Sequence, residues 1–275
     1  KKKHVLPIIS FMFCLQGFSQ THSLTKLWQT DTLLKTPESV LYKEGLKFLL
    51  VSNIDGQADA KDGKGSIGKI SLDGKIIKTD WVTGLNAPKG LGLYKNKLYV
   101  ADITDVVVID IDKEKIIETI PVDGSVFLND ITIDKKGIVY VSDTKLSKVY
   151  KIENGKVALF VDNIKNANGL LAVNDDVYAL ANGNLLKIDA AKNVTTLATG
   201  METSTDGIEM VNNTDFIVSS WIGVVYYVKT DGTKEVLLNN KDLKINTADI
   251  GYDAKKKIVY IPTFYKNFVA AYQLK

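Results

Sequence analysis

Residues with carboxylate or amide oxygens recur about every 40 residues along this chain, each at the start of a short apolar segment. Of the six matched positions, Glu38, Asn129, Asn168, Asp206 and Asp249 carry such oxygens, and the sixth is Lys89. Carboxylate and amide oxygens without His or Cys are hard ligands that suit Ca²⁺, and less well Mg²⁺ or Mn²⁺. If the fold brings these side chains together, the pattern predicts a divalent-cation site and disfavours zinc or copper.

The same residues have a simpler interpretation, because Asn-Gly and Asp-Gly are common turn dipeptides. The turn between the first and second strands of a repeat is supplied elsewhere, however, for example by residues 94–97 and 133–137. Asn168-Gly169 and Asp206-Gly207 precede a first strand, where no hairpin turn is required. The set in matched register therefore favours a site over turn chemistry.

A repeated strand explains how such residues would converge. An apolar phrase ending in a small or polar residue occurs at residues 48–54, 97–103, 138–144, 176–182, 215–221 and 258–264. A period of roughly 40 residues built from short strands is typical of a β-propeller with about four strands per blade. The copies predict an all-β, six-bladed β-propeller, in which first-strand starts surround one mouth of the central channel.

The last repeat lacks a fourth strand, because the chain ends at Lys275 soon after the third. The segment Ser23 to Thr30 reads as a strand with no other partner. We expect this N-terminal strand to close the last blade, which removes exposed sheet edges.

The N-terminus has the features of a targeting segment. Lys1 to His4 are basic, Val5 to Leu15 form a short apolar run, and the small residues Gly17 and Ser19 follow. The run of about 11 residues is shorter than the roughly 20 that span a bilayer. We expect residues 1–19 to be a cleaved signal peptide, residues 20–275 to be the propeller, and the protein to be secreted or periplasmic. The single cysteine, Cys14, would leave with the signal.

Composition excludes several partners. All 35 basic residues are lysine, and arginine supplies the planar fork used for phosphate and nucleic-acid recognition. A lysine-biased proteome would also explain this composition. The formal net charge is +3 and falls near zero once the three N-terminal lysines are removed. We expect a small-molecule substrate, no nucleic-acid partner, no membrane span and, by assumption, a monomer.

Four motifs carry a resemblance to a known family. They are PESVLY around Glu38, FLNDITID around Asn129, NANGLLAV around Asn168 and STDGIEMV around Asp206. In order and spacing they resemble the motifs of the regucalcin/gluconolactonase (senescence marker protein-like) family of six-bladed β-propellers, related more distantly to diisopropyl fluorophosphatase and the paraoxonases. The match covers essentially the whole chain after residue 19.

The resemblance implies a divalent ion, usually calcium, at the channel mouth. Glu38, Asn168 and Asp206 look like direct ligands, Asn129 a ligand or a substrate contact, and Asp206 a general base. The chain departs from the family where sugar lactonases have substrate-orienting arginines, since it has none. His4 and His22 lie outside the propeller strands, so a Ser-His-Asp site, a zinc hydrolase and a histidine acid/base pair are disfavoured.

The reaction that remains is metal-assisted hydrolysis of an ester or lactone, with Asp206 or Asp249 receiving the proton. A non-catalytic secreted or periplasmic ligand-binding propeller with a structural calcium ion is the main alternative. A lyase or isomerase using the same mouth is a third. Asp249 as a further ligand would weaken the hydrolase hypothesis, because it would occupy an open coordination position.

Other residues at the ends of second strands share the same mouth. Additional pocket residues expected there are Asn53, Asp102, Asp143 and Asp249. Trp221 and Phe264 could line the pocket, but packing between blades is the favoured interpretation. The long connection from Asp55 to Ser66 in the first blade is equally consistent with a lid and with a plain solvated loop.

Overall fold

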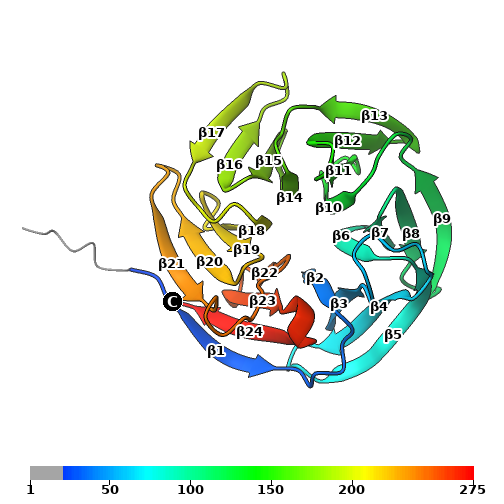
Figure 1. Ribbon diagram of the computed structural model, residues 1–275, viewed down its shortest axis with the longest axis horizontal. Coiled ribbons are helices and arrows are strands. Elements are labelled where there is room, and N and C mark those ends of the chain that lie inside the picture. The colour runs from blue at the N-terminus through cyan, green and yellow to red at the C-terminus, as the bar shows by residue number, and fades with distance from the viewer. Residues whose placement is uncertain (1–20) are drawn as a thin grey trace, which may run out of the picture.

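The computed structural model describes residues 21–275 as six four-stranded antiparallel sheets arranged around a central axis (Figure 1). This confirms the prediction of an all-β, six-bladed β-propeller. The expected signal peptide, residues 1–19, lies outside the described residues. Within residues 21–275, no helix has the length and apolar character needed to cross a membrane.

The first five blades run outward from the axis in chain order. Blade one contains β2 (Pro37–Leu41), β3 (Phe48–Asn53), β4 (Gly65–Ser71) and β5 (Ile76–Leu85). Blade two contains β6 (Pro88–Tyr94), β7 (Lys97–Asp102), β8 (Asp105–Asp110) and β9 (Lys115–Pro121). Blade three contains β10 (Leu128–Ile133), β11 (Val139–Asp143), β12 (Lys148–Glu153) and β13 (Lys156–Val161).

Blade four contains β14 (Ala167–Val173), β15 (Asp176–Ala181), β16 (Asn184–Ile188) and β17 (Val194–Ala198). Blade five contains β18 (Thr205–Val211), β19 (Asp215–Ser220), β20 (Val224–Val228) and β21 (Lys234–Asn239). Blade six contains β22 (Gly251–Asp253), β23 (Ile258–Pro262), β24 (Val269–Leu274) and β1 (Leu24–Gln29). A 3-10 turn, η1 (Phe264–Lys266), connects β23 to β24.

The ring is closed by its two ends, as predicted. β1 pairs antiparallel with β24, from Leu24 opposite Leu274 to Gln29 opposite Ala270. Figure 1 shows the blue N-terminal strand outside the red C-terminal strand in the same blade. Pairing the first strand with the last gives blade six its fourth strand and covers the β24 edge.

The hydrophobic cores lie between adjacent blades. One cluster joins Leu50 and Trp81 of blade one to Val100 and Val107 of blade two, all of them buried. The middle strands are β-branched and buried, as in β20 (Val224–Val228), whereas the outer β17 is largely exposed. Each blade therefore depends on its neighbours for burial, and these packed faces hold the inner strands in place around the axis.

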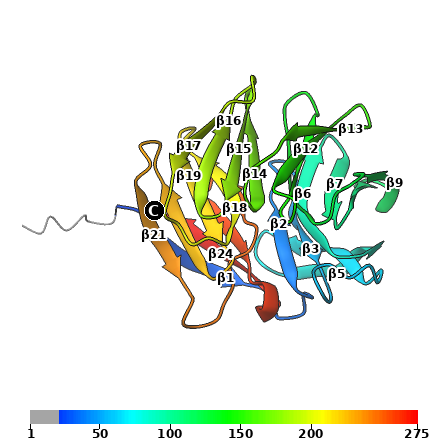
Figure 2. The ribbon, with the colours of Figure 1, turned by 45° about the horizontal axis from the view of Figure 1, so that its top comes forward.

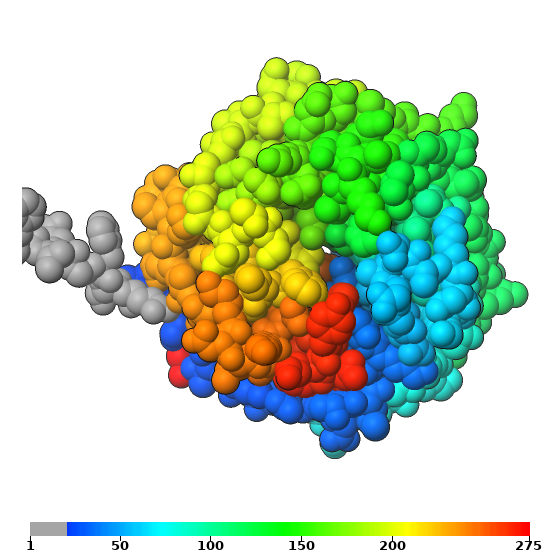
Figure 3. Space-filling view, in the orientation of Figure 1, coloured from blue at the N-terminus to red at the C-terminus, as the bar shows by residue number. Residues whose placement is uncertain are grey.

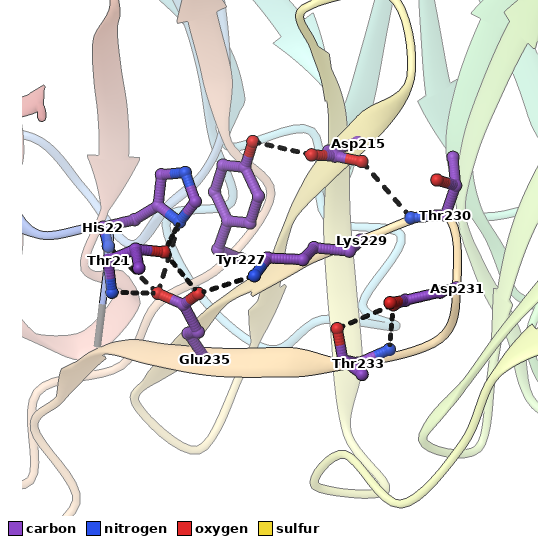
Figure 4. A network of polar contacts seen from close by, with 9 residues as sticks. All are labelled: Thr21, His22, Asp215, Tyr227, Lys229, Thr230, Asp231, Thr233 and Glu235. Carbon is purple, nitrogen blue, oxygen red and sulfur yellow. Dashed lines mark hydrogen bonds and ion pairs between the residues drawn. The ribbon is translucent and has the colours of Figure 1, made fainter. Parts of the chain in front are cut away.

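The N-terminal arm is fastened to blade five by a polar cluster around Glu235 of β21 (Figure 4). The carboxylate accepts hydrogen bonds from the Thr21 backbone N–H at 3.0 Å, the Thr21 hydroxyl at 2.8 Å and the His22 backbone N–H at 3.0 Å. The Lys229 ammonium lies 3.2 Å away, and the His22 ring stacks on Tyr227 with centroids 3.7 Å apart. Burial alone would raise the pKa of Glu235, but these donors lower it to about 2.

We predict that Glu235→Gln lowers the melting temperature at pH 7 by a few degrees, since losing the charged acceptor costs about 1–3 kcal/mol. A depressed carboxyl pKa stabilises the fold above the unfolded value and ceases to do so as pH falls through the folded value. The difference between wild type and variant should therefore shrink between about pH 4.5 and pH 2. Melting curves by circular dichroism measure this.

Glu118→Gln is the matched control, because Glu118 is an exposed glutamate on the outer strand of another blade. It should melt with the wild type at every pH. Equal melting of the Glu235→Gln variant and the wild type at pH 7 would refute a stabilising role for the arm.

Candidate cation and substrate site

Five of the six matched residues line one cavity at the mouth of the channel. Each is the second residue of an innermost strand, and they are Glu38, Lys89, Asn129, Asn168 and Asp206. The cavity has a volume of about 450 Å³. Figure 3 shows an opening at the centre of this face, with the red C-terminal segment and the light-blue part of blade one beside it. The predicted convergence of these side chains therefore occurs in the fold.

A β-bulge accounts for the position of these side chains. In blades one to five, the pairing of the inner strand with its neighbour shifts at the matched residue, as between Pro37 and Ser39 or between Thr205 and Ile208. The same shift occurs in the first pairs of blades two, three and four. A bulge interrupts the ladder and re-aims a side chain, and bulges are common beside functional sites.

Blade six breaks this pattern, because the matched position holds Ala248 and not Asp249. Glu209 pairs with Ile217 in blade five, and Gly251 pairs with Tyr260 in blade six, where both partners are the third residue of the repeated phrase. The residue three positions before Gly251 is Ala248, just as Asp206 lies three before Glu209. The sequence register that aligned Asp249 with Asp206 is therefore wrong by one residue.

Asp249 instead belongs to a second tier, one residue further along the inner strands. It lines a separate cavity of about 230 Å³ together with Ser39, Asp130 and Glu209. The Ser39 hydroxyl donates a 2.5 Å hydrogen bond to Asp249, and the Leu170 backbone N–H donates to Asp130 at 2.6 Å. Asp130 and Glu209 are channel residues that no sequence motif indicated. Only the strand register reveals them.

Glycine follows several of the site residues because the next inner strand comes very close. A Cβ atom on Gly169 would lie 2.1 Å from the carbonyl oxygen of Asp206, and one on Gly207 would lie 2.4 Å from the Ile250 nitrogen. Backbone atoms cannot move aside as a flexible side chain could. Gly169 is thus the residue that permits Asn168 and Asp206 to be neighbours.

We predict that Gly169→Ala destabilises the protein by about 1–3 kcal/mol, because the methyl group must separate two packed strands. It should also weaken any cation binding at the mouth, since Asn168 and Asp206 would move apart. Chemical denaturation measures the first effect. Gly155→Ala is a control for loss of glycine, because a Cβ there would meet nothing within 4 Å. Its positive φ of 73° gives that control a backbone cost of its own, without any steric clash. Stability equal to the wild type for Gly169→Ala would contradict the close approach.

Two buried oxygens at the mouth have no hydrogen-bond partner among the described residues: Glu38 Oε2 and Asn168 Oδ1. The Asn168 amide nitrogen donates to Asp206 Oδ1 at 2.8 Å, and that of Asn129 donates to the Thr144 hydroxyl at 3.0 Å. Because each amide nitrogen donates to a protein group, the amide oxygen is left available to a ligand or an ion. A buried acceptor without a donor costs about 1–3 kcal/mol, which a bound cation would relieve.

The candidate ligands combine carboxylate and amide oxygens, a combination that fits a hard divalent cation. Within residues 21–275, no three or more Asp, Glu, His and Cys side chains are grouped so that they could hold a metal ion by themselves. The candidate set therefore depends on the amide oxygens of Asn129 and Asn168 beside the carboxylates of Glu38 and Asp206. Such oxygen ligands suit Ca²⁺ best.

Electrostatics at the mouth also favour a cation. Burial, followed by repulsion from Asp206 and Asp249, raises the pKa of Glu38 well above its usual range. Burial and Asp249 likewise raise the pKa of Asp206, and burial raises that of Asp249 to about 7. Buried like charges oppose one another's ionisation, so a divalent cation would stabilise the ionised forms.

Lys89 is the site residue whose role the sequence did not indicate. Its side chain is only 2% exposed, and burial lowers its pKa to about 8, against the opposing effect of Glu38 and Asp102. A lysine in a ring of oxygen ligands does not bind a cation. It instead places one positive charge in the same cavity as the oxygen ligands.

The additional pocket residues expected from the second-strand ends do not line the cavity. The Asp102 carboxylate accepts a 2.7 Å hydrogen bond from the Ala87 N–H, and Asp143 accepts one of 2.7 Å from the Val126 N–H. The Asn53 amide donates to a backbone carbonyl of β5 at 3.0 Å. Asp102 and Asp143 thus fasten the segments that lead into the inner strands. They position the site but do not line its cavity.

Aromatic side chains form another part of the cavity wall. Trp221, Phe264 and Tyr265 line it, and the Trp221 and Phe264 rings meet edge to face with centroids 5.5 Å apart. Phe264 also packs with the buried residues Ile54 of blade one and Ala248 of its own blade. Phe264 therefore has both roles, packing against buried residues and forming part of the pocket wall.

The long connection of blade one reaches the same mouth. Ala58 lines the cavity, Asp59 pairs with Lys145 of blade three at 3.2 Å, and Lys61 donates to Thr104 of blade two at 2.6 Å. These contacts hold the connection across two neighbouring blades. They make it part of the wall of the cavity.

We predict that calcium raises the melting temperature, because an ion that binds only the folded state stabilises it. The increase should be larger at pH 8 than at pH 5, since the raised pKa values of Glu38 and Asp206 mean that protons compete with the ion at lower pH. In chelator the sign reverses: carboxyls with raised pKa values destabilise the fold as pH rises. Differential scanning fluorimetry at the two pH values measures both effects.

Glu38→Gln should remove most of the calcium response, and Glu44→Gln, an exposed glutamate, is its control. A calcium response that survives Glu38→Gln unchanged would place the ion elsewhere. So would a response independent of pH.

Comparison with known proteins establishes the fold. No protein-family model matches the chain, and no curated protein matches its sequence. A solved streptogramin B lyase matches with a TM-score of 0.68 at 11% identity, over 92% of this chain and 98% of that one. A catalytically inactive virginiamycin B lyase from Staphylococcus aureus with quinupristin matches with a TM-score of 0.64 at 13% identity, over 92% and 99% of the two chains.

A protein of unknown function from Bacteroides thetaiotaomicron also matches, with a TM-score of 0.69 at 13% identity over 88% of this chain and 70% of that one. Structural neighbours thus share the β-propeller fold and include enzymes. At these identities the likeness concerns the fold alone. Membership of the regucalcin/gluconolactonase family remains an expectation from the four motifs.

Proposed function

We propose that the protein is a divalent-metal-dependent hydrolase of the lactonase or esterase type, acting on a small molecule at the channel mouth. The observation that carries the proposal is the pair of unpartnered buried oxygens, Glu38 Oε2 and Asn168 Oδ1, on a cavity of about 450 Å³. A cavity of that size accommodates a small organic molecule.

Glu38, Asn129, Asn168 and Asp206 would hold the ion. Their oxygen donors suit Ca²⁺ best, with Mg²⁺ and Mn²⁺ as weaker fits. When bound, such an ion supplies Lewis-acid polarisation of an ester carbonyl and makes a neighbouring water more acidic. The Asn168 amide donates to Asp206 and fixes which carboxylate oxygen remains available. The Asn129 amide nitrogen donates to the Thr144 hydroxyl, which leaves the Asn129 amide oxygen available.

Asp206 is the proposed catalytic residue, acting as general base. Burial and the neighbouring Asp249 raise its pKa, so Asp206 accepts a proton more readily than an ordinary aspartate does. No histidine lies among the cavity-lining residues, and the proposed proton acceptor is therefore one of these carboxylates. Asp249, in the second tier, would act on Asp206 through its charge and not as a ligand.

A non-catalytic ligand-binding propeller remains the principal alternative, because every feature above also suits an ion that is structural. Export is part of the proposal too. The basic and apolar segment at residues 1–19 supports a secreted or periplasmic location, where calcium is abundant enough to fill a modest site.

We predict calcium-dependent turnover of aldonolactones or simple aryl esters that stops on chelation. Asp206→Asn keeps an oxygen ligand and nearly the same volume while removing the base, so it should lower kcat by about 10²-fold or more. The calcium-induced rise in melting temperature should fall much less. Asp175→Asn, on an exposed turn, is the control and should retain wild-type turnover.

Steady-state kinetics and thermal shifts on the same preparations separate the two functions. Turnover that persists in chelator, or in Asp206→Asn at the wild-type rate, would refute the hydrolase proposal. Calcium stabilisation without turnover across the panel would favour the binding alternative.

A further inference from the structure

The Lys89 ammonium is an unmatched cation inside the cavity. It donates one hydrogen bond, to the Ala87 carbonyl oxygen at 2.9 Å, although an ammonium carries three donors. No carboxylate among residues 21–275 lies within ion-pair distance of it. A buried charge without a paired charge is expensive, so the fold retains Lys89 at a cost in stability.

The nearest charges do not satisfy this group. Glu38 and Asp102 act on it through their fields, but Asp102 is committed to backbone N–H groups of the segment before β6. The Phe127 ring lies 4.5 Å from the Lys89 nitrogen, which supplies a cation–π contact and no acceptor oxygen. Two N–H donors of Lys89 therefore have no acceptor among residues 21–275, and the side chain is one of those that line the cavity.

Lys145 is a second lysine that contacts the Phe127 ring. Its nitrogen lies 4.7 Å from the Phe127 ring but pairs with Asp59 at 3.2 Å and is half exposed. One ammonium on this ring is thus neutralised at the surface, while the other is buried and lacks a carboxylate. The buried one is the candidate for an anionic ligand.

We propose that Lys89 binds a carboxylate of the ligand, so that the mouth selects small carboxylated molecules with an apolar or aromatic body. Under the proposed hydrolase function, on which this extension rests, the substrate would be an ester or lactone that carries a separate carboxylate. That carboxylate would lie at Lys89 and Phe127, and the carbonyl at the side of Glu38 and Asn168.

A carboxylate suits the site better than a phosphate. A phosphate dianion is usually held by several donors, often an arginine fork, and the chain has no arginine. Lys89 supplies one compact charge, which matches a monoanion. The aromatic side chains of Phe127 and Trp221 on the same cavity provide apolar surface for the rest of the ligand.

Binding of phenylacetate and of its neutral isostere phenylacetamide tests this assignment directly, by isothermal titration calorimetry with calcium present. We expect the wild type to bind phenylacetate at least about tenfold more tightly, and Lys89→Met to bring the ratio close to one. Lys145→Met, which removes the other ammonium on Phe127, should keep most of the preference. Lys89→Met should fold, since it replaces a buried charge by a side chain of similar volume.

Circular dichroism melting checks that expectation, and Lys89→Gln is the second variant if the methionine form melts early. No preference for phenylacetate in the wild type, or an unchanged preference in both Lys89 variants, would overturn the assignment. A preference for phenyl phosphate more than tenfold above phenylacetate would replace the carboxylate by a phosphate and equally overturn it.

Failure of this inference and failure of the hydrolase proposal give different results. The binding preference does not require turnover, so it can appear in a protein that hydrolyses nothing. Conversely, calcium-dependent hydrolysis of neutral esters without any preference for carboxylated ones would leave the hydrolase proposal intact and refute the role of Lys89.

Discussion

The site depends on one constraint, the close approach of the inner strands around a narrow axis. The Asn168 amide can donate to Asp206 of the next blade only because Gly169 lets the two backbones approach so closely that a single methyl group would not fit. That proximity also buries carboxylates beside one another and leaves oxygens without donors. These features destabilise the fold at the mouth, and a bound cation would offset that destabilisation.

The remainder of the fold maintains this arrangement. Apolar clusters between blades fix the angle of each inner strand, Asp102 and Asp143 fasten the segments that enter the strands, and β1 closes the ring against β24. In blades one to five, a bulge at the matched residue then turns its side chain toward the mouth. Structure far from the cavity therefore determines distances within it.

Sequence periodicity was sufficient to predict the blades, the closing strand and the convergence of Glu38, Asn129, Asn168 and Asp206, because all follow from a repeat of small structural units. The position of Asp249 was not predictable, since the first strand of blade six is short and its register depends on pairing with β23. Asp102 was assigned to the pocket because strand ends share a mouth, but its backbone partners arise from loop geometry. The burial of Lys89 depends on side chains from other blades.

The central claim is that the mouth holds one divalent cation between Glu38 and its neighbours in the ring. Calcium-soaked crystals, with an anomalous difference map at long wavelength, test it most directly. The account predicts one strong peak within about 2.3–2.6 Å of both Glu38 Oε2 and Asn168 Oδ1. A mouth without a peak at saturating calcium, or calcium bound only at surface carboxylates, would contradict it.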